Sequence, residues 1–419
     1  MRRTYGPAAL GAAAAVWLAL AAGPAVATNG YIANGYGGGS KGMAGAGVAV
    51  GSGVLGLAQN PAHGAKLGNS AGLCFTFFSP SRDVTIGGAA PLATGKFESE
   101  NEFFLIPCGG ANFRIDERSA FGVYAYGNGG LNTEYDVNFF GGSSPLGVDL
   151  MQGFVALNYA REVAPGLHVG GGPVLAIQRF EARGLEPFAG FSADPANLTN
   201  NGHEMSYGGG AKIGVLWDAN DHLTLGASYQ TRMWMTPFDD YAGLFAEQGD
   251  FDVPPIVTLG LAVRPAPATL PLTVTVEWQR IFYGDVASVS NSGNAAALGA
   301  GNPLGSDDGP GFGWDDMDVL RVAAVYEATD ALTLRAGASW NTQFADDDEV
   351  LLNTLAPATP RVHLSVGFSY EVGDGWGVTG SYTHAFSETV SGSNPAFGGQ
   401  PIDLRMDQHE VSLGVTYRW

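Results

Sequence analysis

The sequence is poor in charged residues and in cysteine, and beyond its N-terminal segment it has no long apolar run. Charged residues make up 14% of the 419 residues, and the formal net charge is −20 at pH 7. A nucleic-acid partner needs a basic face, so this acidic balance argues against one. No later stretch approaches the ~20 apolar residues of a transmembrane helix. Instead, 63 glycines separate short runs rich in Tyr, Phe, Val, Leu and Thr, which is an all-β composition.

Residues 1–27 have the features of a secretory signal peptide. A basic start, a short apolar core at 8–22 and a small-residue cleavage site at 25–27 follow one another in the usual order. The alternative is an uncleaved membrane anchor, but the apolar core is short and the cleavage site follows it directly. We therefore expect an exported chain that begins at Thr28.

After about residue 70 the sequence falls into segments with the period-two alternation of β-strands, joined by alternately short and long connections. Short turns on one side and long loops on the other are typical of an outer-membrane barrel. We predict an all-β, transmembrane antiparallel β-barrel of 14 strands over residues 71–419, in the outer membrane of a Gram-negative cell. The expected strands are 71–80, 101–114, 119–128, 151–162, 167–181, 205–217, 222–232, 254–264, 271–283, 317–327, 331–341, 360–372, 375–386 and 406–419.

Each expected strand has an apolar face and a polar face. The closing stretch "MDQHEVSLGVTYRW" alternates in this way, and "ALTLRAGASW" and "RVHLSVGFSYEV" repeat the pattern. A soluble sheet would alternate too, but the signal peptide, the strand number and the terminal aromatic residue together favour lipid against the apolar face. Aromatic residues at strand ends are typical of the two membrane interfaces. They are Trp217, Trp340, Trp376, Tyr417 and Trp419.

Residues 28–70 do not alternate; they are rich in small residues and nearly uncharged. Glycine and alanine let backbone pack closely in a narrow space. We interpret this segment as a hatch, or plug, folded into the lumen rather than as a periplasmic tail.

Four stretches carry a resemblance to a known family. They are "GSKGMAGAGVAV…LAQNPA", "IPCGGANFRIDERSAFGVYAYGNGGLNTEY", "WDDMDVLRVAAVYEATDALTLRAGASWN" and the closing strand, and the most specific piece is Asn60-Pro61-Ala62. Over essentially the whole mature chain the sequence resembles the FadL/TodX family of outer-membrane transporters for long-chain fatty acids and other hydrophobic compounds. The resemblance implies a fourteen-stranded barrel closed by an N-terminal hatch.

The resemblance also implies a route for a hydrophobic ligand. The ligand meets an apolar groove between long extracellular loops and passes to a deeper pocket that touches the hatch. It then leaves sideways into the membrane through a hole at a kink in the third strand, near the Asn60-Pro61-Ala62 turn. An N-terminal apolar side chain reaches into the deep pocket, a part that Tyr31 or Ile32 would play.

Residues suited to each step are present. The third strand carries Gly127-Asn128-Gly129-Gly130, and glycine there permits a bulge or bend, although an ordinary strand end is the alternative. The loops at 182–204 and 233–253 carry apolar side chains that form a ligand groove or, alternatively, pack together to hold the loops shut. These side chains are Leu185, Phe188, Phe191, Met233, Trp234, Met235, Phe238, Tyr241, Leu244 and Phe245.

The remaining polar features have plainer interpretations. Cys74 and Cys108 lie in adjacent strands and are either a disulfide or two buried thiols. The seven histidines have no metal-ligand spacing, so no metal or cofactor is expected. Acidic clusters at 239–240, 307–308, 315–316 and 346–349 are solvated loop tips or sites for divalent ions. The lumen face carries Arg321, Arg335 and Lys212, which are candidates for meeting a ligand carboxylate or for structural charge pairs.

The sequence therefore predicts a passive transporter of hydrophobic small molecules and not an enzyme. The alternatives are a general porin and an outer-membrane adhesin or receptor. An enzyme would need a positioned nucleophile, and no motif surrounds Ser365, Ser369 and His363, which share one face. The expected partners are the ligand, outer-membrane lipid and lipopolysaccharide, and the barrel assembly machinery through the C-terminal strand. We expect a monomer.

Overall fold

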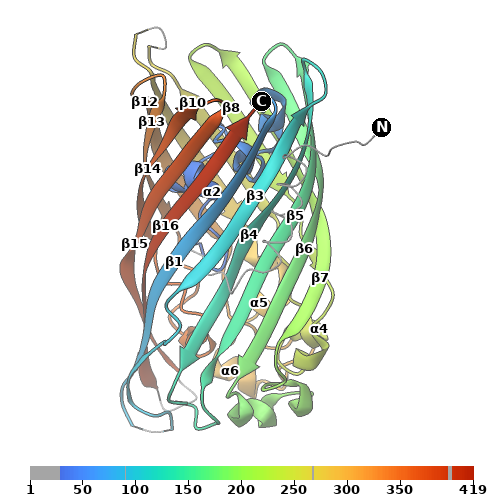
Figure 1. Ribbon diagram of the computed structural model, residues 1–419. Helices are drawn as coiled ribbons and strands as arrows, with labels where there is room; N and C mark the ends of the chain where they lie inside the picture. The colour runs from blue at the N-terminus through green and yellow to red at the C-terminus, as the bar shows by residue number, and fades with distance from the viewer. Residues whose placement is uncertain (1–28, 90, 267–268, 395–398) are drawn as a thin grey trace.

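The computed structural model describes residues 29–89, 91–266, 269–394 and 399–419. The predicted signal peptide and Thr28 lie outside these residues. Within the described residues, fourteen antiparallel strands form a barrel in which each strand pairs with the next barrel strand and β16 closes on β1 (Figure 1). The strands are β1 (Ser70–Ile86), β3 (Phe104–Arg114), β4 (Ser119–Tyr135), β5 (Leu146–Ala164), β6 (Leu167–Arg183), β7 (Glu204–Asn220), β8 (Leu223–Gln230), β10 (Ile256–Val263), β11 (Leu272–Ile281), β12 (Met317–Glu327), β13 (Leu332–Asn341), β14 (Val362–Gly373), β15 (Trp376–Asn394) and β16 (Gln400–Arg418).

The predicted fourteen-stranded barrel is confirmed, and its closure is complete. Strands β1 and β16 pair from Ser70 opposite Arg418 to Ile86 opposite Ile402. Two short strands lie off the wall: β2 (Gly95–Glu98) pairs with β1, and β9 (Trp234–Met235) pairs with β7. Closure gives the backbone groups of the first and last strands a partner, which lipid cannot supply.

Several strands are longer than predicted, mainly toward the long loops, although β7 also extends to Asn220 beside a short turn. The first strand, expected at 71–80, ends at Ile86, and the third, expected at 119–128, ends at Tyr135. The reason is visible on β16, where the outward side chains change from Leu413 and Val411 to the exposed Arg405. The backbone ladder continues beyond the apolar band, so the alternation that marks a strand in the sequence fades before the strand ends.

The two faces of each strand separate as predicted. On β14, Val366 and Phe368 are exposed on the outside, whereas His363 and Ser365 are buried inside the barrel. The outward apolar residues are therefore placed to contact lipid, and the inward polar residues line the lumen. Among the described residues, no helix is both long and apolar enough to span a membrane.

Short helices occupy two places. Four lie in the N-terminal segment 29–69, and the others lie in the long loops, which are at the bottom of the view in Figure 1. The first four are α2 (Gly37–Lys41), η1 (Val54–Ala58), η2 (Pro61–His63) and α3 (Gly64–Leu67). The loop helices are η3 (Glu186–Phe191), η4 (Pro195–Asn197), η5 (Asp239–Tyr241), α4 (Ala246–Gly249), η6 (Tyr283–Asp285), α5 (Ala287–Ser290), α6 (Ala295–Gly299) and α7 (Val350–Asn353).

The N-terminal segment, residues 29–69, lies inside the barrel and is called the lumen segment below (Figure 1). Most of its residues are buried against inward-facing wall residues. Its backbone approaches the wall so closely that a Cβ at Gly226 of β8 would collide with the Val48 carbonyl oxygen. The glycines of the wall are thus matched to the small residues of the segment.

A charge at the middle of the outward face tests the membrane placement. We expect Val366→Arg to destabilise the barrel folded in lipid vesicles by about 2–4 kcal/mol, because the site lies in the apolar band. The matched control is Val372→Arg on the same face of β14 beside a short turn, where about 0–1 kcal/mol is expected. The measurement is a urea titration of folded and unfolded gel bands. Equal effects at both positions would contradict the placement.

Candidate functional site

An apolar cavity lies between the long loops. Its wall is formed by two side chains of the barrel strands and by side chains of four long loops. They are Val148 and Phe180 of the strands, and Leu185, Phe188, Leu244, Phe245, Ser288, Leu304, Pro310, Gly311, Phe312, Leu352 and Leu355 of the loops. The space it encloses, including its open side, is about 460 Å³. Among the described residues, Ser288 gives the cavity a polar side chain and no charged side chain lines it, so the cavity suits a hydrophobic occupant.

The predicted groove residues divide into two groups. Leu185, Phe188, Leu244 and Phe245 line this cavity, and Phe238 and Tyr241 are buried in the same apolar cluster. Phe191 and Trp234, in contrast, are 41% and 61% exposed and lie outside that cluster. The prediction of a groove of exposed side chains is therefore corrected. The loop side chains pack together because aromatic residues this numerous bury one another, and the space that they leave is a cavity with one open side.

An aromatic cluster lies where the loops meet the lumen segment. Tyr31 is fully buried, with its ring 5.2 Å from Tyr283, 5.7 Å from Trp314 and 5.8 Å from Phe251, measured between ring centroids. The Tyr283 hydroxyl donates to the Asn29 carbonyl at 2.6 Å. Tyr31 thus packs among aromatic side chains of the long loops, and the gating part that the resemblance implies for it stays a prediction. The sequence analysis had not singled out Tyr283 and Trp314, because they come from another loop far along the chain.

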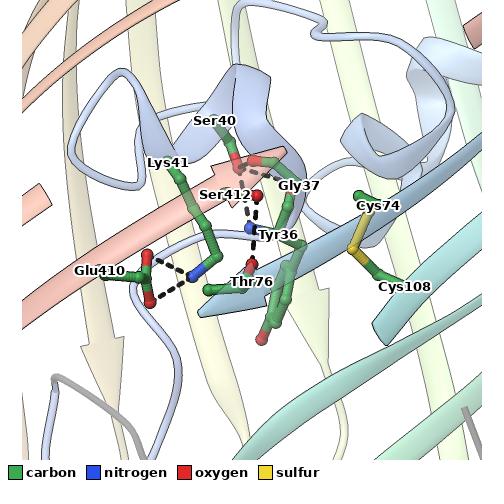
Figure 2. Close-up of a disulfide and its surroundings, with 9 residues drawn as sticks. All are labelled: Tyr36, Gly37, Ser40, Lys41, Cys74, Thr76, Cys108, Glu410 and Ser412. Atoms are coloured by element: carbon green, nitrogen blue, oxygen red, sulfur yellow. Dashed lines mark hydrogen bonds and ion pairs between the residues drawn. A yellow bond between two sulfur atoms is a disulfide. The ribbon is translucent and has the colours of Figure 1, made fainter. Parts of the chain in front are cut away.

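Buried ion pairs hold the lumen segment to the wall. Lys41 Nζ lies 2.8 Å from both carboxylate oxygens of Glu410 on β16, and both side chains are almost fully buried (Figure 2). On β11, Glu277 accepts from the backbone N–H groups of Gly47 and Val48 at 2.8 Å and pairs with Arg321 at 2.9 Å. Breaking one partner of such a pair leaves an uncompensated buried charge, so these contacts fix the segment in place.

The Asn60-Pro61-Ala62 turn is a further anchor. The Asn60 amide donates to the Val48 and Val215 carbonyls at 2.7 and 3.0 Å, and its oxygen accepts from the Ala62 N–H at 3.0 Å. Asn158 of β5 donates to the Pro61 carbonyl at 3.0 Å. The turn is therefore bound to β5 and β7. The expectation that it lies at the third-strand kink is corrected, since the contacts to that kink come from residues 31–36.

The third barrel strand, β4, separates from its neighbour β3 at the glycine run. The two strands pair from Ala120 opposite Arg114 to Tyr126 opposite Cys108. Beyond that pair β3 continues against β1, and β4 continues against β5 with a register shift between Gly127 and Gly129. The glycine run is thus a bulge inside a continuous strand, and the interpretation as an ordinary strand end is wrong. We call the break in pairing between residues 104–107 and 127–135 the seam.

The lumen segment satisfies part of the free edge of β4 at the seam. The Ala33 N–H donates to the Asn128 carbonyl at 2.8 Å, and the Gly130 N–H donates to the Tyr31 carbonyl at 2.9 Å. Ile32 faces Gly129 in this short bridge. A Cβ at Gly129 would collide with the Tyr31 carbonyl oxygen, so only glycine allows the approach. The residue that enters the aromatic cluster therefore also borders the seam.

Residues 99–101, called the strap, cross the loop side of the seam. The Glu100 N–H donates to the Glu134 carbonyl of β4 at 2.8 Å, and the Ser99 hydroxyl accepts from the Glu134 N–H at 3.1 Å. The Ser99 N–H also donates to the Arg82 carbonyl of β1 at 2.9 Å. The strap thus joins β1 to β4 across the end of β3.

A disulfide lies at the other end of the seam. Cys74 and Cys108 are joined, with Cα atoms 4.9 Å apart on β1 and β3, beside the lumen segment at Tyr36 and Gly37 (Figure 2). Cys108 is opposite Tyr126, the last pair before the strands separate. The bond therefore ties β3 to β1 at the point where β3 leaves β4.

The three predicted lumen cations have partners within the wall or the segment. Arg321 is paired with Glu277, Arg335 donates to the Ser369 hydroxyl at 2.7 Å, and Lys212 donates to the Ala58 carbonyl. Arg82, which the sequence analysis missed, is buried on β1 beside the seam. Its position in the alternating pattern marks it as inward-facing, and that signal could have found it.

Burial also perturbs the titration of loop carboxyls. Burial, followed by the nearby Asp252 charge, raises the pKa of Asp250 to about 6, and Arg232 opposes this effect. Burial likewise raises the pKa of Glu349, which accepts from the Ser292 hydroxyl at 2.5 Å and the Gly293 N–H at 2.7 Å. The Glu349 carboxylate joins one long loop to another, whereas the Asp250 carboxylate pairs with Arg232 of its own loop at 3.4 Å. In the described part of the chain, no group of three or more His, Cys, Asp or Glu side chains is placed to hold a metal ion.

Comparison with known families and structures identifies the fold. Residues 13–283 match the model of the outer membrane protein transport protein family (OMPP1/FadL/TodX). The chain belongs to this family. The FadL/TodX resemblance is therefore confirmed, and the outer-membrane location follows from it. No curated protein sequence matches the chain.

Solved structures of the FadL/TodX fold superpose on nearly the whole chain. The P. putida toluene transporter TodX has a TM-score of 0.71 at 17% identity, covering 92% of this chain and 99% of TodX. A Pseudomonas aeruginosa FadL homologue gives 0.67 at 15% identity, covering 93% and 99%. The Ralstonia pickettii toluene transporter TbuX gives 0.64 at 18% identity, covering 92% and 99%. At these identities the likeness establishes the fold of this FadL/TodX member and leaves its ligand to be argued from its own residues.

The raised pKa of Asp250 predicts that the loops tighten in acid. An acid whose folded pKa is above its ordinary 3.8 favours the folded state when protonated, so stability rises as pH falls from about 6 toward 4. We expect hydrogen exchange of residues 245–253, corrected for intrinsic rates, to slow between pH 7 and pH 5. Asp250→Asn should remove this difference, whereas Asp308→Asn, at an exposed loop position, should keep it. Faster exchange at pH 5 would contradict the assignment.

Proposed function

We propose that this protein is a passive transporter that carries hydrophobic small molecules across the lipopolysaccharide-bearing leaflet and releases them sideways into the outer membrane. The observation that most supports this proposal is that the barrel contains three features suited to such a route: the apolar loop cavity, the aromatic cluster at Tyr31 and the seam. The relatives TodX and TbuX are described as toluene transporters. We extend to this chain the broader class, long-chain fatty acids or aromatic and aliphatic hydrocarbons.

The cavity and the aromatic cluster belong to one apolar core. Phe188 and Phe245 of the cavity wall are part of the same buried cluster as Tyr31, Tyr283 and Trp314. Moving a hydrocarbon from lipid into water costs about 0.8 kcal/mol per CH₂. A continuous apolar path keeps the cargo out of water at every stage, and therefore no energy source is needed.

The lumen segment is proposed to act as the hatch, with the barrel beginning at about residue 71. Tyr31 packs in the aromatic cluster, while its carbonyl and the Ala33 N–H hold the free edge of β4. Displacement of Tyr31 by cargo would therefore loosen the contacts that fill the seam. This coupling makes Tyr31 and Ile32 the proposed gating residues, Asn60, Pro61 and Ala62 the anchor of the hatch, and the bulge at Gly127–Gly130 the proposed exit.

A filled lumen argues against a general porin, which works through a water-filled channel. We expect lipid and lipopolysaccharide against the outward faces, assembly through the C-terminal strand, and a monomeric barrel that contains its whole route. No observation favours the receptor or enzyme alternatives.

Uptake by cells that lack their own hydrophobic-compound transporters tests the function. Expression of the protein should accelerate uptake of radiolabelled toluene or laurate. Phe188→Ala removes part of the cavity wall and should reduce the rate several-fold. The matched control is Phe191→Ala on the same loop, which lies outside the cavity cluster and should behave as wild type. Wild-type uptake no faster than that of empty-vector cells would overturn the proposal.

Removal of the hatch tests the lumen assignment. Deletion of residues 28–62 should raise single-channel conductance in planar lipid bilayers, because it removes the segment that fills the barrel. The intact protein and Phe191→Ala should conduct poorly. A deletion variant with unchanged conductance would show that other residues close the lumen.

A further inference from the structure

Arg361 differs from the other outward arginines near the loop ends of the strands. Its guanidinium carbon lies 5.3 Å from the ring centroid of Trp340, and its Nε donates to the Asn341 carbonyl at 3.2 Å. Among the described residues, no carboxylate lies within ion-pairing distance of Arg361, so its positive charge is not neutralised by the chain. The other outward arginines do have carboxylate partners: Arg179 pairs with Asp149, Arg183 with Glu134, Arg280 with Asp318 and Arg405 with Asp83.

Trp340 and Arg361 lie at the loop-side end of the apolar band. Trp340 is the last residue but one of β13 and is 44% exposed, and Arg361 immediately precedes β14. Trp340 is opposite the exposed Val362, and the next outward residue of β14 is the exposed Leu364. Exposed aromatic rings of barrels lie at the interface between lipid and water, and long loops face the cell exterior. The head groups beside Arg361 are therefore those of lipopolysaccharide.

A second outward cation lies on β16, which β15 separates from β14. The Arg405 side chain is about half exposed, and its Nε donates to the Ser387 hydroxyl of β15 at 2.8 Å. The exposed Phe386 precedes Ser387 in an irregular part of β15. Since neighbouring strands are about 4.8 Å apart, the strands of Arg361 and Arg405 are about 10 Å apart. We call Trp340, Arg361, Phe386 and Arg405 the basic rim.

The acidic side chains near the basic rim lie toward its Arg405 end. Asp83 of β1 is 3.7 Å from Arg405 and 3.5 Å from Lys96, and Lys96 is 2.7 Å from Glu98 of β2. Asp407 is the neighbouring outward residue of β16, because it lies between the inward Met406 and Gln408. These carboxylates belong to β1, β2 and β16, so the Arg361 end of the rim is the more positive one.

We propose that the basic rim binds a phosphate group of lipid A, the acylated and phosphorylated anchor of lipopolysaccharide, with Arg361 as the main contact. A guanidinium suits a phosphate because its N–H groups can donate two parallel hydrogen bonds, and the Trp340 ring holds this guanidinium in place. Arg405 contacts the same head group, and the acyl chains lie against Val362 and Phe386. The inference depends on the outer-membrane location and not on the transported compound.

Titration with lipid A tests the site. The full barrel is folded in detergent from inclusion bodies, free of lipopolysaccharide, and its binding of fluorescent diphosphoryl lipid A is measured by anisotropy. We expect Arg361→Gln to weaken binding about ten-fold, the value of one charge-assisted contact, and Arg361→Lys to weaken it less. The matched control is Arg280→Gln, at an outward arginine that pairs with carboxylates, which should change binding less than about two-fold. Asp407→Asn removes a negative charge and should bind at least as tightly as wild type.

Each outcome supports or overturns the site. The wild-type protein should bind dephosphorylated lipid A about ten-fold more weakly or worse, and equal binding would overturn the proposal even if Arg361→Gln does not fold. The proposal also fails if Arg361→Gln and Arg280→Gln have equal effects, or if Asp407→Asn binds more weakly. Inorganic phosphate should not compete with lipid A. Phosphatidylglycerol that competes as well as unlabelled lipid A would overturn the choice of lipid A as the occupant.

Discussion

Lipid offers no hydrogen bonds, and this one constraint organises the molecule. Every backbone group at membrane depth must find a partner within the chain, and pairing of β1 with β16 meets that requirement around the wall. At the seam, the neighbouring strands β3 and β4 do not form backbone hydrogen bonds with each other. There the edge of β4 is covered by residues 31–33 from inside and by the strap from the loop side. The sideways exit of the proposed function requires such a break in strand pairing, covered by segments that can move away.

The lumen segment combines firm and weak attachments. Its middle is held by buried pairs, Lys41 with Glu410 and Glu277 with Gly47 and Val48, which would be costly to break. Its beginning is held by two backbone hydrogen bonds to β4 and by ring contacts of Tyr31. In the proposed function, the beginning of the segment is therefore the part that a hydrophobic cargo would displace, because the cargo can replace the aromatic contacts.

The two cavities along the proposed route differ in the charge of their lining. The loop cavity has no charged lining, so it accepts any apolar compound of suitable size. A second cavity, which Arg82 lines beside the seam, adds one arginine without a carboxylate partner among the described residues.

Local pattern determined the barrel, its strand number, the lipid-facing side chains and the small-residue character of the lumen segment, because each follows from period-two alternation or from composition. The pattern also marked Gly127–Gly130 as a weak point and Cys74 and Cys108 as neighbours. Only the tertiary structure decided that the glycine run lies inside a strand, that the Asn60 turn binds β5 and β7, and that Phe191 and Trp234 lie outside the loop cavity. Those outcomes depend on contacts between residues far apart along the chain, such as Ile32 with Gly129 and Asn60 with Val215, and such separations leave no periodic trace. Closure of the barrel brings them together.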